Sequence, residues 1–201
     1  MSILVTGFEP FGSEPHNPSA EIASALTGAS IGGLPVTTAV LPVDFNAVGS
    51  VLHTLLATHR PALLLSLGLA RSTDTLRFER VALNLCDARI PDNAGAQPID
   101  QPVVPTAPAA YFSTLPVKLM TAAAEEHAPS TLSFSAGSYV CNAVMFHALH
   151  FTAGTGCRAG FLHVPPARTI PVDQVTRAVH AALSAAAWAT ADLRQPGGTL
   201  H

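Results

Sequence analysis

Short runs that are apolar at almost every position alternate along this chain with segments of helical period. Residues 3–6 form the first such run, which closes at Gly7, and residues 62–67 form another. A strand that is apolar on both faces is typical of a parallel sheet covered by helices, because an exposed face would carry polar residues. We therefore predict an α/β fold with a mostly parallel, twisted sheet and helices on both faces.

The order of the remaining elements fits this architecture. Asn17, followed by a proline, can cap one helix, and Asp44 can cap another. Residues 75–85 look extended, and residues 90–110 form a long loop, which in a compact domain favours a functional role. Further strands are expected at 36–41, 131–135 and 159–164, and further helices at 117–126, from about 141, and at 172–189.

Charged residues make up only 11% of the 201 residues, and the net charge is −3. The length suits a single domain, which we place at residues 1–193, followed by a flexible tail at 194–201. Lys118 is the only lysine, and the arginines are scattered along the chain. Nucleic acids and anionic membranes bind clusters of lysine and arginine, so we expect neither as a partner.

We expect no segment that directs the protein to or across a membrane. No apolar run approaches the ~18 residues of a membrane span, and the first strand starts at once, without a basic leader. Cys86, Cys141 and Cys157 form no C-x-x-C pair, which argues against a disulfide framework and a structural zinc site. We expect a cytoplasmic protein with reduced thiols and no metal.

In open α/β sheets, ligands bind beyond the carboxyl ends of the strands. One loop at that edge leads from a predicted strand through Ala-Gly-Ser to Cys141, which should stand at the start of the next helix. A helix N-terminus stabilises negative charge and favours the thiolate, the nucleophilic form of cysteine. Cys141 is therefore a candidate nucleophile, and a buried structural cysteine is the alternative interpretation. Cys86 and Cys157 lack this setting.

A cysteine nucleophile needs a base and a group that orients the base. Among the nine histidines, His163 ends a buried-strand pattern at its carboxyl end, where two prolines turn the chain away. Glu79 lies inside an extended run, where an acid is costly unless it is paired. Glu79 is therefore a candidate for the group that orients His163. An ion pair between Glu79 and its flanking arginines is the alternative, and Asp87 and Asp92 compete for the role.

Two phenylalanines mark the loop at residues 7–12, Gly-Phe-Glu-Pro-Phe-Gly. The loop lies where a dinucleotide fold has its phosphate loop, but it is not G-x-G-x-x-G, and its aromatic rings would obstruct a pyrophosphate. Exposed aromatic side chains at this edge instead indicate a small apolar pocket. The alternative is a hydrophobic plug on the sheet. Phe8 and Phe11 are the candidate wall residues.

Four segments of the chain match known signatures in order. They are Gly-Phe-Glu-Pro-Phe-Gly at 7–12 with Asn-Pro-Ser at 17–19, Glu-Arg-Val-Ala-Leu-Asn at 79–84 with Asp-Ala-Arg-Ile-Pro-Asp-Asn at 87–93, Ser-Ala-Gly-Ser-Tyr-Val-Cys-Asn at 135–142, and Gly-Phe-Leu-His-Val-Pro at 160–165. Together they resemble the family of pyroglutamyl peptidase I, also called pyrrolidone carboxyl peptidase. The matches cover nearly the whole chain.

The resemblance implies a cysteine peptidase that removes an N-terminal pyroglutamate from peptides. Cys141 would then be the nucleophile, His163 the general base and acid, and Glu79 the residue that orients His163. The resemblance also implies no cofactor, a cytosolic location and a homo-oligomer, commonly a tetramer, otherwise a dimer. The residues that it places around the lactam ring are Phe8, Phe11, Leu69, Ile90, Tyr139 and Val140, with Arg89 helping to hold the carbonyl or the peptide.

The chain departs from the family pattern at two places. Residues 68–71 read Gly-Leu-Ala-Arg where members usually have Gly-Gln-Ala-Gly, and Tyr139 replaces a more usual phenylalanine. Leu69 keeps a contact made by backbone atoms but loses one made by a glutamine side chain. A catalytically weak or inactive relative that binds a cyclic amide or a similar small ligand is therefore the main alternative. A nucleoside phosphorylase shares this type of sheet, but the sequence shows no cationic phosphate site.

Overall fold

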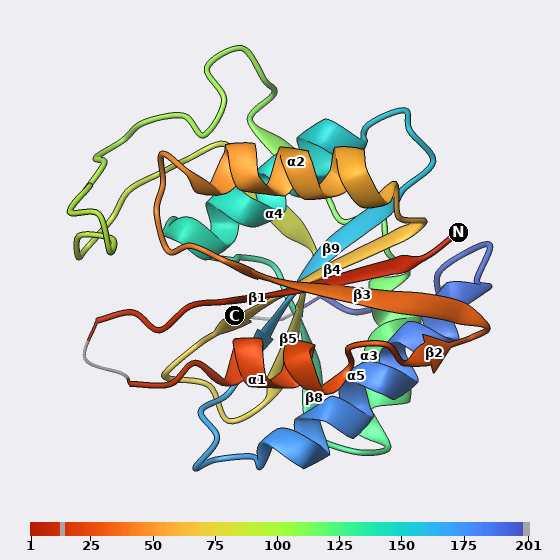
Figure 1. The fold of residues 1–201 in the computed structure, drawn as a ribbon. Coiled ribbons are helices and arrows are strands. Elements are labelled where there is room, and N and C mark those ends of the chain that lie inside the picture. The colour runs from red at the N-terminus through yellow and green to blue at the C-terminus, as the bar shows by residue number, and fades with distance from the viewer. Residues whose placement is uncertain (13–14, 199–201) are drawn as a thin grey trace.

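Seven strands form the central sheet of the computed structural model, which describes residues 1–12 and 15–198. Their order is β2-β3-β1-β4-β9-β5-β8 (Figure 1). The strands are β1 (Ile3–Phe8), β2 (Ser30–Ile31), β3 (Leu34–Leu41), β4 (Leu63–Leu69), β5 (Leu76–Glu79), β8 (Ser130–Ser133) and β9 (Arg158–Val164). β3, β1, β4 and β9 run parallel, which confirms the predicted sheet. Their carboxyl ends therefore meet at one edge.

The helices cover both faces of this sheet, as predicted (Figure 1). α1 (Pro18–Ala25), α3 (Val117–Glu125) and α5 (Val172–Ala187) pack on one face, and α2 (Val48–His59) and α4 (Val140–Thr152) pack on the other. Successive residues of β1 point to opposite cores: Ile3 and Val5 join the first, and Leu4 and Phe8 join the second. All six residues of β1 are buried, which explains why its sequence has no polar face.

The start of α1 fixes the end of β1. Asn17 caps α1 by accepting a hydrogen bond from the Ser19 amide at 3.1 Å, as the sequence predicts. The Ser19 hydroxyl in turn accepts a hydrogen bond from the Phe8 amide at 3.0 Å. A Cβ atom at Gly7 would lie 2.3 Å from the Ser19 carbonyl oxygen, so only glycine lets α1 approach this closely.

Two predicted boundaries are wrong. α2 begins at Val48 rather than directly after Asp44, because the Asp44 carboxylate accepts from the amides of Asn46 and Ala47 and holds a turn there. The extended segment at 75–85 is not one strand. It divides at Arg80 into β5, in the main sheet, and β6 (Val81–Leu83), which pairs with β7 (Ala110–Phe112) in a separate two-stranded sheet. This small sheet joins the two ends of the long loop.

The C-terminal segment contacts α3. The Asp192 carboxylate accepts hydrogen bonds from the amides of Lys118 and Leu119, at 3.2 and 2.9 Å, and the Lys118 ammonium donates to the Gln195 carbonyl. The predicted flexible tail begins at residue 194, and its last residues, 199–201, lie outside the described residues.

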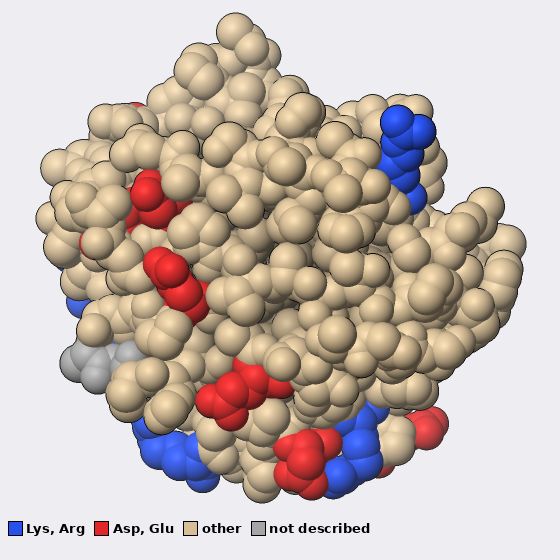
Figure 2. All heavy atoms as spheres, in the orientation of Figure 1, with Lys and Arg blue, Asp and Glu red and all other residues tan. Residues whose placement is uncertain are grey.

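Charged side chains are sparse on the surface. On the face drawn in Figure 2, most of the surface is neutral, and the few lysine and arginine side chains lie toward its rim, one of them beside acidic side chains. Among the described residues, no helix is both long enough and apolar enough to cross a membrane.

Candidate active site

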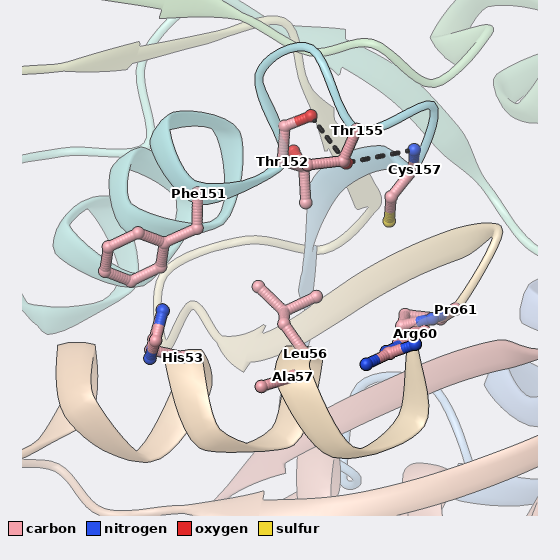
Figure 3. Close-up of a pocket in the computed structure, with 9 residues that line it drawn as sticks. All are labelled: His53, Leu56, Ala57, Arg60, Pro61, Phe151, Thr152, Thr155 and Cys157. Carbon is pink, nitrogen blue, oxygen red and sulfur yellow. Dashed lines mark hydrogen bonds between the residues drawn. The ribbon is translucent and has the colours of Figure 1, made fainter.

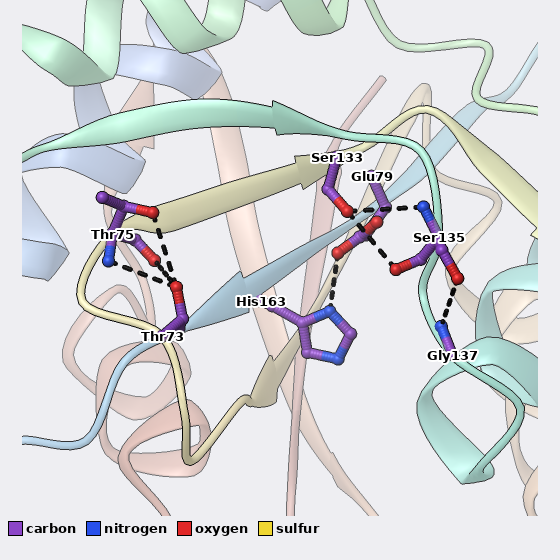
Figure 4. Close-up of polar contacts among 7 residues, drawn as sticks. All are labelled: Thr73, Thr75, Glu79, Ser133, Ser135, Gly137 and His163. Atoms are coloured by element: carbon purple, nitrogen blue, oxygen red, sulfur yellow. Dashed lines mark hydrogen bonds and ion pairs between the residues drawn. The ribbon is translucent and has the colours of Figure 1, made fainter. Parts of the chain in front are cut away.

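Cys141 is the second residue of α4, where the sequence predicts a helix start. The chain reaches it from β8 through a turn held by serine side chains: the Ser133 hydroxyl contacts the backbone of Ser135, and Ser135 Oγ accepts from the Gly137 amide (Figure 4). The Asn142 side chain then fastens the first helical turn to β6 and the residues after it, with bonds of 2.8–3.0 Å to the backbone of Leu83 and Leu85.

The thiol of Cys141 lies against the carboxyl end of β4. A Cβ atom built at Gly68 would be 2.8 Å from Cys141 Sγ and 2.7 Å from the ring of Phe161. Any side chain at position 68 would therefore fill the space that the sulfur occupies. A glycine at this strand end is what lets the half-buried thiol lie against the sheet.

His163 and Glu79 form a buried pair beside this thiol. They come from β9 and β5, which run antiparallel, and Figure 4 shows the two side chains pointing toward one another. His163 Nδ1 lies 2.8 Å from Glu79 Oε1. The carboxylate is fully buried, and within the described residues its other oxygen, Oε2, has no hydrogen-bond partner. The contact with His163 is therefore the hydrogen bond that compensates the burial of this charge.

The structure separates Glu79 from its two competitors. Asp92 is buried, but its carboxylate accepts hydrogen bonds from the amides of Phe45, Ala94 and Ala96, so it organises a loop. Asp87 is exposed. Among these three acids, Glu79 is the one whose carboxylate contacts the His163 ring.

His163 keeps its proton to unusually high pH. Burial lowers the pKa of the imidazole, but hydrogen bonds with Cys141 and Glu79, together with the negative charges of these groups, raise it to about 9. Because Nδ1 faces Glu79, the other ring nitrogen, Nε2, is the one left for the Cys141 sulfur. The imidazolium is thus present at neutral pH and is lost as the pH rises through about 9.

A small apolar pocket adjoins Cys141 and includes most of the predicted wall. Two lining residues were not predicted: Asn17, which caps α1, and Val43, which follows β3 at the carboxyl edge of the sheet. Ligands in open α/β sheets bind beyond the carboxyl ends of the strands, and Val43 lies at such an end. The lining residues are Phe8, Phe11, Asn17, Val43, Leu69, Tyr139, Val140 and Cys141.

Three predicted pocket residues differ from the others in position or exposure. Arg89 and Ile90 are exposed on the long loop and are not among the residues that line this pocket, so their roles stay predictions. Phe8 was expected to be exposed, but it is the last residue of β1 and is buried, whereas Phe11 is half-buried.

Tyr139 connects the pocket to the long loop. Its ring packs edge-on against Phe45, with centroids 5.3 Å apart, and lies 6.3 Å from the ring of Phe11. Its hydroxyl donates to the Pro91 carbonyl at 3.0 Å. The hydroxyl that distinguishes this residue from the more usual phenylalanine is therefore bound by the loop.

The long loop also holds in place the segment at residues 7–12, called the aromatic segment below because it carries Phe8 and Phe11. Asn93 donates from its side-chain amide to Glu9 Oε1 at 2.8 Å and to the Pro10 carbonyl at 2.9 Å. Glu9 Oε1 also accepts from the Val43 amide at 3.0 Å. Asn93 belongs to a predicted signature segment, but its spacing in the sequence gave no indication of this contact across the chain.

The other two cysteines lie in different surroundings. Burial raises the pKa of the Cys86 thiol and that of the Cys157 thiol to about 11 in each case. Cys157 lines a cavity of about 370 Å³ between α2 and the end of α4 (Figure 3). This cavity also contains Pro61, and both residues precede strands, so it lies at the amino ends of β4 and β9, away from Cys141. Within residues 1–12 and 15–198, no three His, Cys, Asp or Glu side chains are placed to hold a metal ion.

An α/β sheet that carries a cysteine, a histidine and a buried glutamate at one edge has the arrangement of a thiol-dependent hydrolase. Comparison with known proteins gives the family. The family model for pyroglutamyl peptidase matches residues 1–189. The chain belongs to the pyroglutamyl peptidase family, and the resemblance of its four segments is confirmed.

Individual relatives extend this match over the whole length. The pyrrolidone-carboxylate peptidase of Escherichia fergusonii is 41% identical over 100% of this chain and 99% of its own. The solved structure of pyrrolidone carboxyl peptidase from Thermococcus litoralis has a TM-score of 0.93 at 36% identity and covers 97% of this chain and 99% of its own. The solved structure of pyroglutamyl peptidase I from Bacillus amyloliquefaciens has a TM-score of 0.91 at 33% identity. The match covers 96% of this chain and 99% of that structure's chain.

Proposed function

We propose that this chain hydrolyses the bond after an N-terminal pyroglutamate through Cys141, His163 and Glu79. The observation that carries the proposal is that a small apolar pocket and a His–Glu pair both adjoin one cysteine. Family membership supports the same reaction. Peptides that begin with pyroglutamate are the proposed substrates.

The proposed reaction has two stages. The Cys141 sulfur, whose proton is held by His163, attacks the acyl carbonyl, and amides at the start of α4 receive the negative oxygen. His163 gives its proton to the leaving amine, and the carbon–nitrogen bond breaks to leave a thioester on Cys141. Water, with His163 as base, then hydrolyses the thioester and releases pyroglutamate. Glu79 fixes the imidazole throughout by its bond to Nδ1.

The composition of the pocket supports a lactam as the bound group. Pyroglutamate is a flat, neutral ring without a free α-amine, so its site needs no carboxylate. Among the described lining residues beside Cys141, none carries a charged side chain, and aromatic or aliphatic walls surround the pocket. We propose that Arg89 and Ile90 act on the part of the peptide beyond the ring, since both are exposed on the adjoining loop.

We also propose that the protein acts in the cytoplasm as a homo-oligomer, a tetramer or a dimer. Three free cysteines support a reducing compartment. Large apolar side chains that remain exposed on a single chain support a contact between copies: Ile99 is 69% exposed and Phe112 is 65% exposed.

The direct test is hydrolysis of a fluorogenic pyroglutamyl amide by purified protein under reducing conditions. We expect release of the fluorophore from this amide and none from the matching prolyl amide, whose ring lacks the lactam carbonyl and carries a charge. Binding of the lactam, seen as a rise in melting temperature, without any release would contradict the proposal. That result would favour a ligand-binding relative, with Leu69 as the altered residue.

Replacing Glu79 with glutamine should lower the pKa of His163. The substitution removes a negative charge and a strong acceptor from Nδ1, and both raise this pKa in the wild type. We expect kcat/KM of the wild type to fall as the pH rises through about 9, and we expect this alkaline fall to occur at lower pH in the variant. The rate should fall by up to about 10⁴-fold yet stay measurable, because an orienting residue is less essential than a nucleophile.

The pH profile of kcat/KM, measured for both proteins from neutral to alkaline pH, checks this expectation. Glu125→Gln, on the surface of α3, is the matched control and should keep the wild-type profile. An alkaline limb that Glu79→Gln leaves in place would show that Glu79 does not control the proton on His163.

A further inference from the structure

We infer that Arg71 is a positioning residue that holds Phe11 in the wall of the pocket and thereby sets the affinity for the lactam ring. The inference rests on the proposed function of the pocket. Arg71 stands in the segment that departs from the family pattern, on the turn between β4 and β5.

Arg71 contacts Phe11 in two ways. Its Nη2 donates a hydrogen bond to the Phe11 carbonyl at 3.1 Å, and its Cζ lies 4.8 Å from the centroid of the Phe11 ring. One guanidinium therefore holds the backbone and covers the ring of the same residue. A planar cation over an aromatic face is attracted by the ring, and the hydrogen bond fixes the distance between them.

The site that receives the guanidinium is already shaped for it. Gly12 has a φ of +62°, which disfavours a side chain, and a Cβ atom there would lie 3.0 Å from Arg71 Nη2. The turn that carries Arg71 is also fixed at both ends. The Ala70 amide donates to the Val164 carbonyl at 3.0 Å, and the Thr73 hydroxyl donates to the Thr75 carbonyl at 3.0 Å (Figure 4).

Phe11 is a half-buried wall residue at the end of the loop at residues 7–12. The Asn17 side chain donates to the Glu9 carbonyl, and the Asn93 side chain donates to the Pro10 carbonyl. At the next residue, Phe11, the carbonyl accepts from Arg71. The centroid of the Phe11 ring lies 6.3 Å from that of the Tyr139 ring, which also lines the pocket. The cation also acts on Tyr139: burial raises the pKa of that phenol, the charges of Asp92 and Cys141 raise it further, and the charge of Arg71 lowers it.

The test uses Arg71→Met, which keeps an unbranched apolar side chain but loses the charge and the donors, and Arg71→Lys, which keeps a charge and a donor. Arg177→Met is the matched control, because Arg177 is exposed on α5 and pairs with Asp173. Two quantities are measured for each protein. One is KM and kcat for the pyroglutamyl amide. The other is the concentration of 2-pyrrolidone, the bare lactam ring, that halves the rate at which iodoacetamide alkylates Cys141.

We expect Arg71→Met to raise KM about three- to tenfold and to weaken protection by 2-pyrrolidone by the same factor, with kcat within about twofold of the wild type. Arg71→Lys should fall between the two, and Arg177→Met should match the wild type. Equal protection in the wild type and Arg71→Met would overturn the inference, and so would a loss of kcat at unchanged KM. Failure of the proposed function shows separately, as a wild-type protein that does not hydrolyse the amide.

Discussion

Replacing Cys141 with alanine is expected to abolish hydrolysis of a pyroglutamyl amide. The sulfur is the only group of the proposed mechanism that bonds to the substrate, and the pocket would still bind the ring without it. Removal of the nucleophile in comparable hydrolases costs on the order of 10⁶ in kcat. We therefore expect a residual rate near background and an unchanged affinity for 2-pyrrolidone, measured by thermal shift.

Cys157→Ala is the matched control for this loss. Cys157 is half-buried, like Cys141, but it directly precedes β9 and so lies at the opposite edge of the sheet. The Cys157→Ala variant should keep wild-type turnover, and both alanine variants should melt cooperatively. Near-normal turnover by a folded Cys141→Ala protein would remove Cys141 from the mechanism.

Replacing His163 with glutamine is expected to have the second-largest effect. Glutamine is neutral and can still donate to the buried Glu79 carboxylate, so the fold should persist. It cannot carry a proton between the thiol and the leaving amine. General acid–base catalysis contributes about 10²–10⁴-fold, and the activated state of the thiol is lost as well, so we expect kcat/KM to fall by at least about 10⁴-fold.

This variant should also alter the chemistry of the thiol. Without the imidazolium, the rate of alkylation of Cys141 by iodoacetamide should fall at neutral pH. His180→Gln, exposed on α5, should change neither rate. If His163→Gln kept the wild-type rates of hydrolysis and alkylation, His163 would not be the partner of Cys141.

Much of the fold could be predicted because it depends on local patterns. β1 and β4 are apolar at almost every position, which only a sheet covered on both faces explains. The cap of α1 depends on Asn17 and the proline after it, both adjacent to the helix. The position of Cys141 could likewise be predicted, since a turn of small residues between a strand and a helix leaves few alternatives.

Contacts between distant segments could not be predicted in this way. Glu79 meets His163 because β5 runs antiparallel to β9, and nothing within 75–85 indicates that direction. Asp92 looked equivalent to Glu79 in the sequence, yet it binds backbone amides. The support that Asn93 and Arg71 give to the aromatic segment crosses 83 and 60 residues of chain, beyond the reach of any periodicity.

The most direct test of Cys141 as the nucleophile is inactivation by iodoacetamide. Peptide mass spectrometry identifies which cysteine is alkylated and how much of it, while the remaining activity is measured. We expect activity toward the pyroglutamyl amide to fall in proportion to alkylation of Cys141, while Cys86 and Cys157 react far more slowly. We also expect 2-pyrrolidone to slow the alkylation of Cys141 and the loss of activity by the same factor. Full activity in protein alkylated at Cys141, or inactivation that follows another cysteine, would contradict this role of Cys141.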